Sequence, residues 1–169
     1  LEALLGRGRA YLEEGGERSS YLAALDFAAA RFRWPDLVEP ALLLGKVHHL
    51  RGETALAESV FEDAYRHAAE EPSKASEVAA RVAAACLDFK RYEEGLRWVE
   101  RVPEESAKRE RLRANLLVGA GRLDDALRLA ERALDLDPES PKSYEIRGYV
   151  RYKRGDLDLA GADFEKAIA

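Results

Sequence analysis

Apolar residues recur every three or four positions along most of this chain, in short segments separated by glycine, proline or polar pairs. This spacing places side chains on one face of an α-helix, whereas a half-buried β-strand alternates apolar and polar residues. Leu4, Gly8 and Tyr11 follow it in the first segment, and Ala41, Gly45 and His48 in the third. The pattern therefore predicts an all-α protein of about ten helices without a convincing strand.

The breaks in the pattern set the expected helix ends. Proline disfavours helix at the residue before it, and serine caps free backbone amides at helix starts. We expect Ser19-Ser20 to start the second helix in this way. The expected helices span residues 1–14, 19–32, 37–50, 54–69, 73–88, 92–102, 106–120 and 123–136, with two more on either side of Gly155 in 141–169.

The helix pairs repeat. The turn inside each pair falls at Gly15, Gly52, Lys90, Gly121 and Gly155, at separations of 37, 38, 31 and 34 residues. Small residues recur in the first helix of each pair, at Gly8, Gly45, Ala83, Ala114 and Gly148. They recur in the second helix at Ala23, Ala57, Gly95, Ala126 and Ala160. Two helices approach closely only where their crossing points carry little volume, so these columns mark helix contacts.

The segment 141–169, the Leu136-Asp137-Pro138 sequence before it and the repeat length together resemble the tetratricopeptide repeat (TPR) family, whose period is 34 residues. The resemblance implies an α-solenoid of five helix–turn–helix units in one domain, 1–169, with antiparallel helices in a right-handed superhelix. The units are 1–36, 37–72, 73–105, 106–140 and 141–169. Lys90, Gly95 and Ala130 depart from the usual residues, and longer helical repeats are the main rival fold.

Composition restricts the partners. The formal net charge of −5 argues against direct nucleic-acid binding, which needs a basic surface. No apolar run approaches the roughly 20 residues of a membrane span. Arginine outnumbers lysine, which favours a bacterial source with a high-GC genome and is in keeping with a thermophile.

The compartment follows from the single cysteine, Cys86. One cysteine allows no internal disulfide, which fits a reducing cytoplasm. The chain starts at Leu1 and contains no methionine, so we expect a trimmed piece of a longer protein. A periplasmic location is the alternative if a signal sequence was removed.

Residues capable of catalysis are scattered. His48 and His49 are adjacent, so they point about 100° apart on a helix and form no i,i+4 metal pair. Cys86 falls in an inward column of small residues, which favours a buried thiol over a nucleophile. Paired acids such as Asp124-Asp125 fall at helix starts, where capping accounts for them. We therefore expect a non-enzymatic protein with no catalytic residue, cofactor or metal.

The TPR resemblance also implies a ligand surface, because first helices of successive units line a concave groove in that family. The predicted partner-binding residues are Arg9, Lys46, His49, Lys108, Arg111, Asn115, Lys142, Tyr149 and Tyr152. We place most weight on Arg111, Asn115, Lys142, Tyr149 and Tyr152, and expect a peptide or partner-protein segment of acidic character. The alternative is that these are solvated or packing residues. The carboxylate-clamp subtype of the family is disfavoured, because Ile146 stands where its second asparagine belongs.

Two further hypotheses stay open. The chain could be a regulatory or sensor segment of a larger protein, such as a transcriptional or signalling regulator. It could also self-associate, because Phe164 and Ile168 lie on a face of the last unit that a following helix would normally cover. A solenoid needs a polar capping element for solubility, and the sequence offers none at this end.

Overall fold

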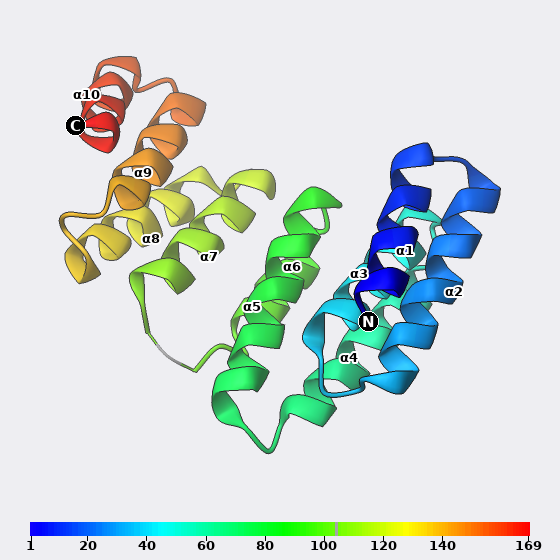
Figure 1. The fold of residues 1–169 in the computed structure, drawn as a ribbon. Coiled ribbons are helices and arrows are strands. Elements are labelled where there is room, and N and C mark those ends of the chain that lie inside the picture. The colour runs from blue at the N-terminus through cyan, green and yellow to red at the C-terminus, as the bar shows by residue number, and fades with distance from the viewer. Residues whose placement is uncertain (104) are drawn as a thin grey trace. The chain divides into compact units, whose positions relative to one another are not determined.

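The computed structural model describes residues 1–103 and 105–169, and this part of the chain contains ten α-helices and no strand (Figure 1). The all-α prediction is therefore confirmed. The helices are α1 (Glu2–Glu14), α2 (Glu17–Arg33), α3 (Val38–Leu50), α4 (Thr54–Ala68), α5 (Pro72–Asp88), α6 (Tyr92–Val99), α7 (Ala107–Gly119), α8 (Leu123–Leu136), α9 (Pro141–Arg154) and α10 (Leu157–Ile168).

The chain forms two compact halves, Leu1–Ala85 and Cys86–Ala169. In the N-terminal half α1 packs on α2, α2 on α3, and α3 on α4. In the C-terminal half the same order continues from α6 through α10, and α7 also contacts α9. These helices thus bury their apolar stripes against their neighbours in the chain, as expected when a single helix pair is too small to form a core.

The turns inside the last four helix pairs are alike, as the repeat predicted. Gly15, Gly52, Gly121 and Gly155 all have positive φ, and Lys90 adopts φ 57°, a region that favours glycine. In the last four pairs the turn residue donates its N–H to the carbonyl three residues earlier, and the next residue donates to the carbonyl five residues before itself. This Schellman arrangement satisfies the free carbonyls at a helix end, which explains why the turn recurs even where lysine replaces glycine.

The small residues of the first helices make room for aromatic rings from the second helices. A Cβ atom on Gly8 would lie 2.5 Å from the ring of Phe27, and one on Gly45 would lie 2.1 Å from the ring of Phe61. Both rings are completely buried. In the fourth pair, where alanine replaces the glycine at Ala114, the aromatic is replaced as well, by Ala130. The two columns therefore fill one shared space, with a glycine and a ring in the first two pairs and with two alanines in the fourth.

Two buried carboxylates stand at matching places in the first and last helix pairs. Asp26 on α2 accepts a hydrogen bond of 2.7 Å from Nε of Arg7 on α1. Asp163 on α10 accepts bonds from Nε of Arg147 at 2.9 Å and Nη1 of Arg151 at 2.7 Å. Each arginine precedes the small glycine of its helix and each aspartate precedes the phenylalanine, so the pair is part of the same packing register. Bidentate pairing compensates the desolvation of the carboxylates.

Several expected helix ends are wrong. The second helix starts at Glu17, after Gly16, and no serine caps it, because Ser19 and Ser20 already lie inside the helix. Asp124 and Asp125 do not cap α8 through a side-chain bond; Asp125 instead pairs with Arg122 and Arg128. The turns at Lys90 and Gly121 are only 31 residues apart because α6 is short and ends at Val99, not at residue 102.

Candidate functional site

The C-terminal half contains a groove of about 560 Å³ between residues of α5, α6, α7 and α9. Basic, amide and aromatic side chains line it together with aliphatic ones. The lining residues are Leu87, Tyr92, Arg111, Asn115, Val118, Gly119, Lys142, Glu145, Ile146 and Tyr149. A cavity of this size that combines apolar walls with a few polar groups is the usual form of a ligand site.

One end of the groove is basic. Nη1 of Arg111 donates to the hydroxyls of Ser140 at 3.3 Å and Ser143 at 3.0 Å, which fixes the guanidinium of α7 against the start of α9. Ser143 is itself fully buried and donates to the carbonyl of Ala133 at 3.5 Å. Lys142 lies exposed on the same helix start. Because Arg111 is held before any ligand arrives, little side-chain entropy remains to be lost on binding.

The other end of the groove is apolar. A Cβ atom on Gly119 would lie 2.1 Å from Cε1 of Tyr92, so the absence of a side chain there lets the tyrosine ring lie directly on the end of α7. Leu87 and Val118 complete this end of the lining. Arg111 and Gly119 are eight residues apart on α7, which corresponds to about 12 Å along the helix axis.

Four of the five most heavily weighted residues lie around this groove: Arg111, Asn115, Lys142 and Tyr149. Tyr149 also receives the Lys153 ammonium at 5.4 Å from its ring centroid. Tyr152 is exposed and is not among the lining residues, and the same holds for Lys108 at the start of α7. Sequence reasoning gave no weight to Tyr92 and Gly119. The sequence feature that could have pointed to them is the run of small residues from Gly119 to Gly121 at the end of α7, which faces the aromatic residue at the start of α6.

The three predicted residues of the N-terminal half lie elsewhere. Arg9 on α1 forms an ion pair with Glu39 on α3. His49 packs its ring 5.8 Å from the ring of Phe61, and Lys46 is half-buried on the same helix. A role of Arg9, Lys46 and His49 in binding stays a prediction.

Other reactive side chains have structural surroundings. Cys86 is fully buried, and burial raises the pKa of its thiol to about 12, with Glu94 adding to the shift. It therefore stays protonated at neutral pH, which makes it a poor nucleophile. His48 pairs with Glu53 at 2.7 Å, and this bond, together with Arg51, lowers the pKa of Glu53. Among the described helices, none is both long and apolar enough to cross a membrane.

Comparisons with known proteins agree with the helical-repeat fold. Residues 111–169 match the family model described as tetratricopeptide repeat. None of the curated proteins compared with the chain matches it. Among solved structures, MamA 41-end from Desulfovibrio magneticus RS-1 is 20% identical with a TM-score of 0.61, covering 99% of this chain and 92% of that one.

Two other solved structures extend the likeness. PilF of Pseudomonas aeruginosa is 17% identical with a TM-score of 0.63, covering 99% of this chain and 74% of that one. Yeast Tom70 is 20% identical with a TM-score of 0.68, covering 97% of this chain and 35% of that one. The family match thus covers residues 111–169, and the chain as a whole has the fold of tetratricopeptide repeat proteins.

Proposed function

We propose that this chain is a non-enzymatic binding scaffold that holds a short peptide, or a segment of a partner protein, in the groove of its C-terminal half. The observation that supports this most directly is the fixed guanidinium of Arg111, flanked by Lys142 and Asn115 at the basic end. Arginine and tyrosine are also the residue types most enriched at binding hot spots.

The polarity of the groove limits the kind of segment that fits. An acidic side chain would lie at Arg111 and Lys142, where two cations face one acid, Glu145. An aliphatic or aromatic side chain would lie at the other end, against Tyr92 and Val118. Asn115, between the two ends, can pair with both an N–H and a carbonyl of an extended backbone. The roughly 12 Å between the ends corresponds to about four residues of extended chain.

The test is a display screen of short peptides against the whole chain, followed by calorimetry on the selected peptides. Arg111→Glu is expected to weaken binding about 10-fold or more, because it replaces attraction by repulsion at a partly buried position. Lys108→Glu makes a similar charge reversal on the same helix outside the lining and serves as the matched control. Asn115→Ala is the second variant. It leaves the bonds from Arg111 to the two serines in place, so weaker binding in this variant could not be ascribed to misfolding around Arg111. If both Arg111→Glu and Tyr149→Ala left binding unchanged, the proposed site would be wrong.

Self-association through the last repeat is a second candidate, favoured by one observation. Leu157, Phe164 and Ile168 lie on one face of α10, and all three are exposed. Replacing Ile168 with glutamate would remove this contact without touching the core, and light scattering over a concentration series would report it. A regulatory role within a larger protein remains the alternative that the full gene would decide.

A further inference from the structure

Among the described residues that line the groove of the C-terminal half, one is acidic: Glu145, beside the cations Arg111 and Lys142. Glu145 is exposed, and no described residue forms a hydrogen bond or ion pair with its carboxylate. Lys142 precedes it by three residues on α9, but an exposed pair at this spacing shifts an equilibrium by about two-fold at most, and lysine before glutamate is the less favourable order. The carboxylate is therefore available to a ligand, and a purely acidic segment would give it no partner.

The lining side chains of α7 and α9 form two matching sets. On α7 they include Arg111, Asn115 and Val118. On α9 they include Lys142, Glu145 and Tyr149. Spacings of three and four residues place each set on one helix face. Because Arg111 bonds to Ser143 near the start of α9, the two sets begin at the same end of the groove.

The groove therefore has three levels. The basic level consists of Arg111 and Lys142, the middle level of Asn115 and Glu145, and the apolar level of Val118 and Tyr149. On α9 the levels are spaced by about 4.5 Å and 6 Å along the helix axis, whereas side chains on one face of an extended chain recur at every second residue, about 6.5 Å apart. The difference of about 2.5 Å over the whole span is within the reach of long side chains such as lysine and glutamate. Residues one, three and five of an extended segment can therefore meet the three levels.

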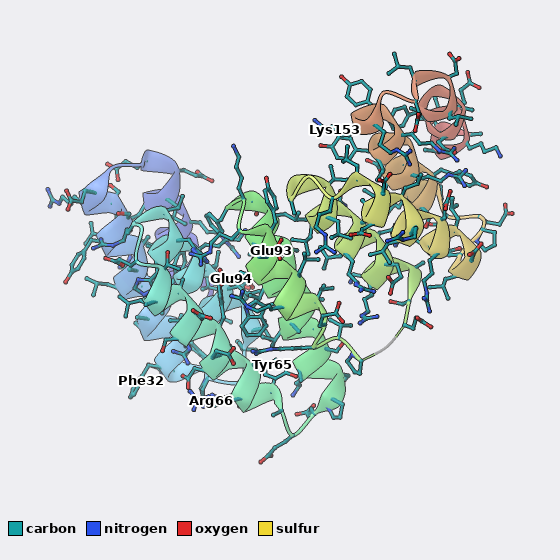
Figure 2. The ribbon with its side chains drawn as sticks, turned by 180° about the vertical axis from the view of Figure 1, so that it is seen from behind. Phe32, Tyr65, Arg66, Glu93, Glu94 and Lys153 are labelled. Carbon is teal, nitrogen blue, oxygen red and sulfur yellow. The ribbon has the colours of Figure 1, made fainter. Side chains whose placement is uncertain are left out.

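Lys153 decides which level accepts a cation. It lies at the end of α9, one turn beyond Tyr149 (Figure 2), and its ammonium is 5.4 Å from the centroid of the tyrosine ring. A second cation at the apolar level would be repelled by this ammonium, and one at the basic level would be repelled by Arg111 and Lys142. At the middle level the same cation meets the carboxylate of Glu145. A ligand with a single basic group is therefore held in one register.

We propose that the groove selects an extended segment with an acidic, a basic and an apolar residue at alternate positions, and that Glu145 is the residue that determines this preference. The inference rests on the proposed function and refines its partner from an acidic segment to one of mixed charge. An acidic residue in the middle of the segment would face Glu145, and like charges in contact cost affinity. Asn115 on the opposite wall is uncharged and pairs with the backbone whichever residue stands there.

Two acetylated and amidated peptides test the preference, because blocked termini leave only side-chain charges. The mixed peptide has glutamate, lysine and leucine at positions one, three and five with serine between them. The acidic peptide has glutamate in place of the lysine, and each is also made in the reverse order. Fluorescence anisotropy at physiological salt, with the whole chain titrated from micromolar to millimolar concentration, gives the dissociation constants. The better-binding mixed peptide is expected to bind about 10-fold more tightly than either acidic peptide.

Glu145→Lys is the variant that tests the role of the carboxylate. It is expected to reverse the preference, so that the acidic peptide binds about 10-fold more tightly than the mixed one, because opposite charges then meet at the middle level. Glu165→Lys makes the same charge change at an exposed position of α10 outside the lining and should leave the ratio of the two dissociation constants unchanged. Both side chains are exposed, so circular dichroism should show unchanged helix content.

Arg111→Glu separates a failure of this inference from a failure of the proposed function. If Arg111→Glu weakens binding while Glu145→Lys leaves the ratio unchanged, the groove is the site but Glu145 does not determine the preference, and the inference is wrong. If Arg111→Glu has no effect on either peptide, the proposed function fails as well. An equal change of the ratio in Glu165→Lys, or no binding of either peptide up to millimolar concentration, would also overturn the inference.

Discussion

The shared volume between the glycine and phenylalanine columns can be tested by filling it. We predict that Gly45→Ala destabilises the N-terminal half. Its new Cβ would lie 2.1 Å from Cε1 of Phe61, whereas ordinary contacts fall between 3.4 and 4 Å, so the ring must move by more than 1 Å. Phe61 is completely buried and the His49 ring lies 5.8 Å away, so little space exists for that movement.

The expected magnitude follows from two opposed effects. Overpacking a filled core costs about 1–3 kcal/mol, and a ring with so little room lies at the upper end. Alanine in place of a helical glycine returns about 1 kcal/mol of helix propensity. The net loss is therefore about 2 kcal/mol, measured as the shift in urea-unfolding midpoint at constant slope.

Gly148→Ala supplies the matched control. Its Cβ would lie 2.9 Å from the ring of Phe164, which is partly exposed and can turn toward solvent. We expect a change of less than about 1 kcal/mol there, because the propensity gain offsets a mild contact.

A second substitution tests the shared volume directly. Phe61→Val should be less harmful in the Gly45→Ala background than alone, by roughly 1–2 kcal/mol of coupling, because the methyl group and the ring compete for one space. Additive effects, or a Gly45→Ala variant as stable as the parent, would refute the reasoning.

Three further predictions concern the turns and the buried charges. Lys90→Gly should stabilise the chain by about 1 kcal/mol in urea unfolding, because Lys90 is held at φ 57°. Asp163→Ala should destabilise it by about 2–4 kcal/mol, because Arg147 and Arg151 lose the carboxylate that satisfies them, and the melting temperature would report this. The pKa of Glu53 is lowered by His48 and Arg51, so its contribution to stability is present above the usual pKa of 4.5 and is lost as pH falls through the lower folded value. Glu53→Gln should therefore flatten the loss of melting temperature below pH 4.5, and an unchanged profile would contradict this.

The helices and turns could be predicted because their causes are local. A glycine at a positive-φ turn such as Gly52 or Gly121 marks its place in the sequence, and apolar spacing marks the buried face. Helix ends were less certain, because α6 stops at Val99 although apolar spacing continues to Val102. Apolar spacing indicates which face of a helix is buried, but it does not indicate at which residue the backbone hydrogen bonds of the helix end.

The sequence by itself thus determined the element type, the repeat and the small-residue columns. Only the tertiary structure decided which side chains meet. Arg7 and Asp26 are nineteen residues apart, and their pairing needs the crossing of α1 over α2. The same holds for the groove, where Arg111, Lys142 and Tyr92 come from three helices. The degree of burial is a further case: packing of α2 against the neighbouring helices buries Phe27 completely, whereas Phe32, about 140° away around the same helix, stays 91% exposed.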